Sequence, residues 1–174
     1  MVYDSLRNRR SEMSGRRHVF ISHHHADDEH VTKLTDSLSR KGYEIRNSSI
    51  RAKPANKERL AKGLVSDNAI KRLLRIKMSW ASTVIVLIGK ETASRPWVNW
   101  EIKKAHELGK RIVGVFTRGG TKADIPPAFE DYGSTLVNWN PDAVIDAVEG
   151  GDNDFRDTDG SFRAPVHTAS TSRC

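Results

Sequence analysis

Short apolar runs alternate along this chain with longer stretches in which apolar residues recur every three or four positions. The most apolar run, residues 83–88 (TVIVLI), is apolar at both odd and even positions after its first residue. This pattern is typical of a central strand of a parallel sheet, which is buried on both faces. Shorter runs predict four further strands, at residues 18–22, 43–46, 111–116 and 135–137.

The stretches between these runs have the period of amphipathic helices. Val31, Leu34 and Leu38 share one helical face, after a possible cap at Asp27 or Asp28 and before Gly42, which favours a helix end. A second helix is predicted after Ser66 or Asp67, with an apolar side formed by Ile70, Leu73, Leu74 and Trp80. Further helical segments are predicted at residues 97–108, 124–131 and 141–148, and a long polar loop is predicted from 47 to about 64.

Strands and helices that alternate with short connections form parallel sheets with right-handed crossovers. We therefore expect an α/β fold, a flavodoxin-like three-layer sandwich with a five-stranded parallel sheet, over residues 18–149. Residues 1–17 are polar and rich in arginine, and we expect a mobile basic extension. Residues 150–174 lack sustained periodicity, which predicts a disordered tail. Removal of residues 1–15 and 155–174 is expected to leave the melting temperature nearly unchanged.

Composition limits the classes of ligand that the protein is expected to bind and the cellular compartment in which it is expected to occur. The formal net charge of +7 favours an anionic ligand. The sequence contains no recognisable DNA-recognition helix and no strand with aromatic residues that could stack on bases, so nucleic-acid binding is not expected. The lone cysteine, Cys174, excludes a disulfide within the chain and favours a reducing cytoplasm, and no apolar run reaches membrane-spanning length.

The segment with the most evident chemistry is Trp97-Val98-Asn99-Trp100-Glu101, which opens a predicted helix after the most apolar strand. Ligands of open α/β sheets bind outside the carboxyl ends of the strands. Glu101 is there a candidate catalytic carboxylate, and Trp97 shares its helix face and can stack on a ring. The alternative is a solvated glutamate that pairs with Lys104. Trp100 points elsewhere, toward the core, an interface or substrate.

Two further groups of polar residues follow predicted strands. Ser22 and His23 end the first strand and can border the same crevice as Glu101, contacting ribose or phosphate. Asn47 and Ser48 end the second strand and can also line the pocket, although such residues equally favour turns. Adjacent histidines such as those at 23–25 do not easily converge on one metal ion, so no metal site is expected.

The order of these elements and several of their motifs resemble a TIR-like domain, most closely the family of ThsB components of the Thoeris anti-phage system. The resemblance covers roughly residues 18–149. It rests on HVFISHH at 18–24, YEIRNSSI at 43–50, the helix end and strand at 76–89, Glu91-Thr92, WVNWE at 97–101, and the following segment to Val115 with its Ala-x-x-x-Gly-Lys. The basic stretch 51–63 and both ends of the chain depart from the family pattern.

This resemblance implies an enzyme that consumes NAD as its substrate, without a separate cofactor. TIR relatives cleave the nicotinamide–ribose bond with one glutamate, which by motif is Glu101 here. The Thoeris relatives are implied to make a cyclic ADP-ribose isomer that activates a partner effector after phage infection. Self-association through TIR-like contacts is implied as well.

Two other classes of function compete with the enzyme. Many TIR domains act mainly as scaffolds through protein contacts, and such a domain would assemble without turning over NAD. A phosphoacceptor receiver shares the predicted architecture but needs an aspartate where the third strand ends, and Gly89 stands there. The presence of Glu101 favours the enzyme over the scaffold.

Overall fold

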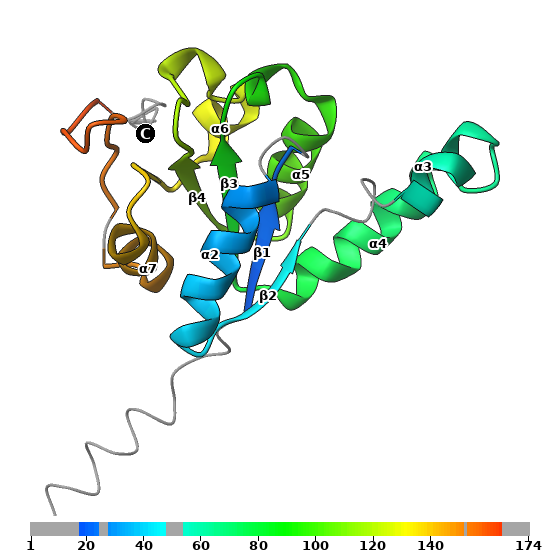
Figure 1. Ribbon diagram of the computed structural model, residues 1–174, viewed down its shortest axis with the longest axis horizontal. Helices are drawn as coiled ribbons and strands as arrows, with labels where there is room; N and C mark the ends of the chain where they lie inside the picture. Colours follow the sequence, from blue (N-terminus) through cyan, green and yellow to red (C-terminus); the bar gives the residue numbers. More distant parts are fainter. Residues whose placement is uncertain (1–17, 25–27, 48–53, 152, 165–174) are drawn as a thin grey trace, which may run out of the picture.

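The computed structural model describes residues 18–24, 28–47, 54–151 and 153–164 of the chain. At its centre is a parallel sheet (Figure 1), which has five strands. The order of the strands across the sheet is β2-β1-β3-β4-β5. The predicted α/β class and five-stranded parallel sheet are confirmed. The strands are β1 His18–Ser22, β2 Glu44–Asn47, β3 Thr83–Ile88, β4 Arg111–Phe116 and β5 Thr135–Val137.

Helices cover both faces of the sheet, because side chains alternate along each strand and both faces of the inner strands are apolar. Val19 and Ile21 lie in a hydrophobic cluster with one pair of helices, whereas Phe20 lies in the opposite cluster. The first pair is α2 Asp28–Arg40 and α7 Pro141–Glu149, and the opposite layer is α4 Asp67–Trp80, α5 Pro96–Glu107 and α6 Pro127–Tyr132.

The prediction of a polar loop from residue 47 to about 64 is wrong for the second half of this stretch. Residues Pro54–Ala61 form the helix α3, which extends with the start of α4 to one side of the sheet (Figure 1). Proline suits the first turn of a helix, and among the described side chains of α3, Leu60 packs against the core cluster. One apolar contact gives no periodic signal, so the helix is not apparent from the hydrophobic pattern.

The next helix, α4, begins where it was predicted, but its buried side is made of partly different residues. The Ser66 hydroxyl accepts a hydrogen bond from the Ala69 N–H at 3.1 Å, the geometry of an N-cap. Ile70, Leu74 and Met78 are buried, whereas Leu73 is 46% exposed and so lies off the predicted apolar side. Among the residues that the structure describes, every helix is too short or too polar to cross a bilayer.

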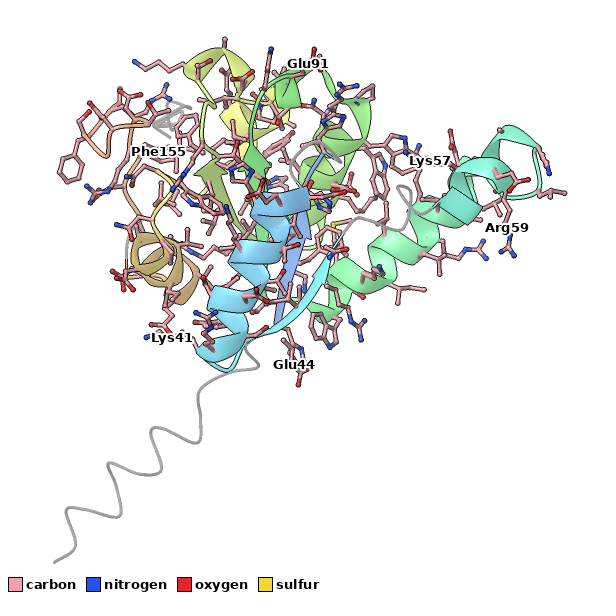
Figure 2. The ribbon with its side chains drawn as sticks, viewed as in Figure 1. Lys41, Glu44, Lys57, Arg59, Glu91 and Phe155 are labelled. Atoms are coloured by element: carbon pink, nitrogen blue, oxygen red, sulfur yellow. The ribbon has the colours of Figure 1, made fainter. Side chains whose placement is uncertain are left out.

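The segment after α7 differs from the expected disordered tail over residues 153–164. Phe155 is buried beside Leu136, and the backbones of residues 154–156 exchange two hydrogen bonds with that residue of β5. The segment thus covers the open edge of the sheet, and Figure 2 shows Phe155 on the inner side of this segment. An isolated phenylalanine among aspartates and glycines gives no pattern, so the sequence did not indicate this contact.

A glycine in the middle of β4 allows α6 to pack on the sheet. A Cβ atom on Gly114 would lie 2.5 Å from the Phe129 ring and 2.9 Å from Leu136, and both side chains are fully buried.

We expect Gly114→Ala to destabilise the fold by about 1–3 kcal/mol, since overpacked cores cannot relax freely. Urea unfolding measures this loss. Gly151→Ala is the control, because its Cβ would meet the Asp146 carbonyl at an ordinary 3.6 Å; equal unfolding midpoints for the two variants would contradict the packing argument.

Candidate active site on the helix after the third strand

The parallel strands bring the candidate residues of β1 and β2 to the same edge of the sheet. Ile21 pairs with Asn47, and Ser22 pairs with Val86 of β3, so both candidates stand at the carboxyl ends of neighbouring strands. The Asn47 carbonyl accepts a hydrogen bond from the Lys77 ammonium group at 3.1 Å, which ties β2 to α4. Ser48 lies outside the described residues.

The connection from β3 to α5 positions the candidate catalytic helix. The Gly89 N–H donates to the Thr92 hydroxyl at 2.9 Å, and Glu91 adopts a left-handed backbone with φ of 67°. Figure 2 shows Glu91 at the edge of the molecule toward which the strands point. A short 3-10 helix, η3 Thr92–Ser94, leads from there to α5, which begins with a proline as helices often do.

Asn99 fixes the start of α5, a role that the sequence alone did not reveal. Its side-chain amide donates to the carbonyl oxygens of Ala93 at 3.2 Å and Arg95 at 3.1 Å. Its Oδ1 accepts from the Ala128 N–H at 3.0 Å, at the start of α6. One side chain thus connects three segments around the helix that carries Glu101.

Asp124 is a second positioning residue that the sequence analysis missed. Its carboxylate accepts hydrogen bonds from the N–H of Glu91 at 3.1 Å and from the N–H and hydroxyl of Thr121 at 2.8 and 3.0 Å. It therefore joins the loop after β3 to the loop after β4, beside the 3-10 helix η4 Lys122–Asp124. The signal was present as a capping box, in which a threonine precedes an acidic residue by three positions.

Glu101 lies on the buried side of α5, together with Val98, Ile102 and Ala105. Only 2% of its surface is exposed, so the alternative of a solvated glutamate is wrong. Lys104, its suggested partner in that alternative, instead forms an ion pair with Glu107 on the surface. Burial of a carboxylate among apolar side chains is costly, and ionisable groups in such places are candidates for function.

Ser22 faces the same layer as Glu101. Side chains alternate along β1, so the Ser22 hydroxyl lies on the same face as Phe20, and this face is covered by α5 and α4. Ser22 is fully buried, and its hydroxyl has no hydrogen-bond partner in the part of the chain that the structure describes. The fold therefore places Ser22 and Glu101 in one layer, at the carboxyl end of the sheet.

His23 faces the other layer. Its Nε2 lies 3.1 Å from Oδ1 of Asp28, at the start of α2, and its side chain is 2% exposed. His23 thus contacts the start of α2, and its part in ligand binding stays a prediction.

Trp97 and Trp100 form one aromatic pair at the start of α5. Their ring centroids are 5.9 Å apart at an interplanar angle of 68°, an edge-to-face arrangement, and both side chains are partly buried. Trp100 therefore contacts Trp97, contrary to the expectation that it points elsewhere. The Lys71 ammonium group of α4 lies 5.9 and 5.7 Å from the two centroids, which adds a cation to this aromatic surface.

The histidines near α2 do not form a metal site with other described residues: in the described ranges, no group of three or more potential ligands could hold an ion. His30 instead packs edge-on against Trp139 at a centroid distance of 5.0 Å. Burial lowers the pKa of His30, and the cations Lys33 and Arg118 add to this effect while Glu29 opposes it.

The depressed pKa of His30 predicts a small pH dependence of stability. The unfolded chain binds a proton near pH 6.5 and the folded protein only at lower pH, so stability falls as pH drops below about 6.5 and levels off once the folded histidine is protonated. His30→Gln should flatten this part of the profile. Urea unfolding between pH 8 and pH 5 measures it, and identical profiles for the two proteins would contradict the assignment to His30.

Comparisons with known proteins identify the family of this fold. The family described as "Thoeris protein ThsB, TIR-like domain" matches residues 20–122, which include Ser22, Asn47, Trp97 and Glu101. A protein of Bacillus cereus (strain MSX-D12), named provisionally as the cyclic ADP-D-ribose synthase ThsB1, is 36% identical over 74 residues. That match covers 39% of this chain and 38% of the relative, so less than half of the relative is represented.

A solved structure that resembles the chain is that of the TIR domains of the activated Roq1 resistosome, which directly recognises the pathogen effector XopQ. The identity is 22% with a TM-score of 0.41, and the match covers 57% of this chain and 56% of the other. The family match, in contrast, spans more than half of the present chain, from β1 to η4. The chain therefore belongs to the family of ThsB TIR-like domains of Thoeris systems.

Proposed function

We propose that this protein processes NAD: it cleaves the bond between nicotinamide and ribose and makes a cyclic ADP-ribose-type product in anti-phage defence. The observation that carries this proposal is the buried carboxylate of Glu101, about one and a half turns into the helix that follows β3. Membership of the family and the synthase name of the relative from Bacillus cereus support it.

The proposed reaction needs few catalytic groups. Cleavage of a glycosidic bond passes through a state with oxocarbenium character, so positive charge develops on the ribose. An ionised Glu101 would stabilise that charge and orient the ribose hydroxyls. Nicotinamide carries its own positive charge in NAD and leaves as a neutral molecule, so one carboxylate can suffice without an acid partner.

Cyclisation adds a second requirement, because water would otherwise capture the ribose cation and give linear ADP-ribose. The partly buried pair of Trp97 and Trp100 provides an apolar surface beside the N-terminal half of α5. Such a surface can stack on a nucleotide ring and exclude water from the cation. Ser22, in the same layer, would donate its hydroxyl to a ribose or phosphate oxygen. Asn47, at the end of β2, would contact the ligand from the neighbouring strand.

The test is direct analysis of products. The purified full chain is incubated with NAD, nicotinamide is quantified by chromatography, and the ADP-ribose species are identified by mass spectrometry. We expect nicotinamide and a cyclic product of equal amount. The same analysis in cells expressing the chain, with and without phage infection, tests the role in defence. Absence of both products in the purified and the cellular samples would contradict the proposal.

A non-catalytic scaffold is the competing function, and one observation favours contacts with other proteins. The outer side of α4 exposes Leu73 and Ile76, the latter by 55%, and Leu64 before it is also exposed. Exposed apolar side chains that lie close together often mark an interaction surface. The scaffold would persist as an assembly in which NAD stays intact, so the product analysis also separates these two functions.

A further inference from the structure

A cavity of about 420 Å³ lies at the carboxyl end of β4, with walls that come from three separate segments of the chain. Its volume is in the range of small-molecule sites and suits a ligand the size of a mononucleotide. The lining residues are Phe116, the turn 117–121, Trp139 from the loop after β5, and Thr158 from the C-terminal segment.

The turn after β4 brings backbone close to this cavity. The Thr117 N–H donates to the Ile88 carbonyl at 3.0 Å, and the Gly120 N–H closes the turn onto the Thr117 carbonyl at 3.0 Å. A Cβ atom on Gly120 would lie 2.3 Å from the Ile88 carbonyl oxygen, and Gly119 has a φ of +84°. Glycine at these two positions permits the tight turn, which stands at the edge of the sheet where α/β folds bind ligands.

Arg118 supplies a positive charge at this turn. Its side chain is exposed, and within the ranges that the structure describes it forms no hydrogen bond or ion pair. The carboxylates around this turn are already engaged: Glu29 of α2, which interacts electrostatically with Arg118, pairs with Lys33 at 2.7 Å, and Asp124 accepts hydrogen bonds from Thr121. A guanidinium group that lines a cavity and forms no hydrogen bond or ion pair with the described residues favours an anionic ligand such as a phosphate.

Trp139 supplies a flat apolar wall. Its ring is partly buried on the α2 side of the sheet, and the edge-to-face contact with His30 at 85° fixes its orientation. An indole held in this way can stack on a planar base with little loss of side-chain entropy. A cation and an aromatic wall in one cavity are the two groups that recognise a nucleotide.

The C-terminal segment completes the cavity. Thr158 lines it together with the turn, three residues after Phe155, which anchors the segment to β5. Thr117 and Thr121 line it from the turn, so threonines of two segments line the space. Hydroxyl groups there can bond ribose or phosphate oxygens.

We propose that this cavity binds a nucleotide, with Arg118 on a phosphate group and Trp139 against the base. The inference goes beyond the reaction proposed for Glu101 and does not rest on it, since the residues that line the cavity come from other segments. It assigns a second nucleotide site, at the end of β4, to a fold whose candidate catalytic carboxylate lies on α5.

Binding of ADP to the full chain tests the proposal, by isothermal titration calorimetry and by the change in tryptophan fluorescence. ADP carries no nicotinamide, so the result is independent of NAD cleavage. We expect ADP to bind with a Kd in the micromolar range, and Arg118→Ala to weaken it about tenfold or more, as for a lost charge-assisted hydrogen bond. Arg72→Ala, at an exposed arginine of α4, is the matched control and should leave the Kd unchanged.

Three further measurements complete the test. Thr158→Trp, a change at an exposed position, should fill the cavity and abolish ADP binding while leaving the melting temperature close to that of the wild type. Adenosine should bind weakly and equally to the wild type and Arg118→Ala. Inorganic phosphate should bind far more weakly than ADP; equal affinity would mean an anion site without a base. No binding of ADP to the wild type, or equal Kd values for the wild type and Arg118→Ala, would overturn the proposal even if NAD turnover is found.

Discussion

Glu101→Gln is expected to lower the rate of nicotinamide release from NAD by about 100- to 1,000-fold, the usual effect of removing one group that stabilises charge in a transition state. Glutamine has nearly the same shape and also forms hydrogen bonds, so it fits the buried position on α5. It carries no negative charge, and a positive charge that develops on ribose is then no longer compensated. Since the loss concerns the transition state, kcat should fall far more than KM changes.

The matched control for this variant is Glu107→Gln, on the same helix. Glu107 is exposed and pairs with Lys104 on the surface, so its loss removes a charge without affecting the buried side of α5. We expect wild-type kcat for the control and similar melting temperatures for all three proteins. If Glu101→Gln retains wild-type turnover, the carboxylate is not the catalytic group; if the wild type itself releases no nicotinamide, the scaffold function gains support.

The elements of the fold that the sequence predicted well are those with a periodic apolar pattern. The run of β3, apolar after Thr83, predicted a central strand, and the spacing of Val31, Leu34 and Leu38 predicted α2. In each of these elements, several apolar residues at regular spacing give the same indication, and all of them lie close together in the sequence. In contrast, among the described side chains Leu60 connects α3 to the core and Phe155 connects its segment, so tertiary contacts decide the structure of both.

For the candidate site, the sequence predicted the region better than the orientation of its residues. The position of Glu101 at the start of the helix after β3 followed from the order of elements. Its burial did not, because a charged residue is by default expected in solvent. The contact of His23 with Asp28 at the start of α2 depends on the path of the chain after β1, which the sequence pattern does not determine. The contact of Trp100 with Trp97 depends on side-chain orientation, which spacing alone does not determine.

Phe155→Ala is expected to lower the free energy of unfolding by about 3 kcal/mol, at the low end of values for a buried phenylalanine. The side chain is 8% exposed and packs in the same core cluster as Leu136. Its segment is held by hydrogen bonds from the Leu136 N–H to the Asp154 carbonyl at 3.1 Å and from the Arg156 N–H to the Leu136 carbonyl at 2.8 Å. For a domain of this size, the loss corresponds to a decrease in melting temperature of about 6–12 °C.

Phe162→Ala is the matched control, because Phe162 lies in the same segment but is 67% exposed. Its ring contacts the Arg156 guanidinium at 4.3 Å, an exposed contact, so we expect a loss within about 0.5 kcal/mol. A chain that ends at Gly151 should lose at least as much stability as Phe155→Ala, since it also lacks the hydrogen bond of 2.8 Å from Arg111 to Asn153. Thermal unfolding of the four proteins measures these differences. Melting temperatures within 1 °C or so of each other would mean that the segment does not stabilise the fold, and that the wall formed by Thr158 is not held in place.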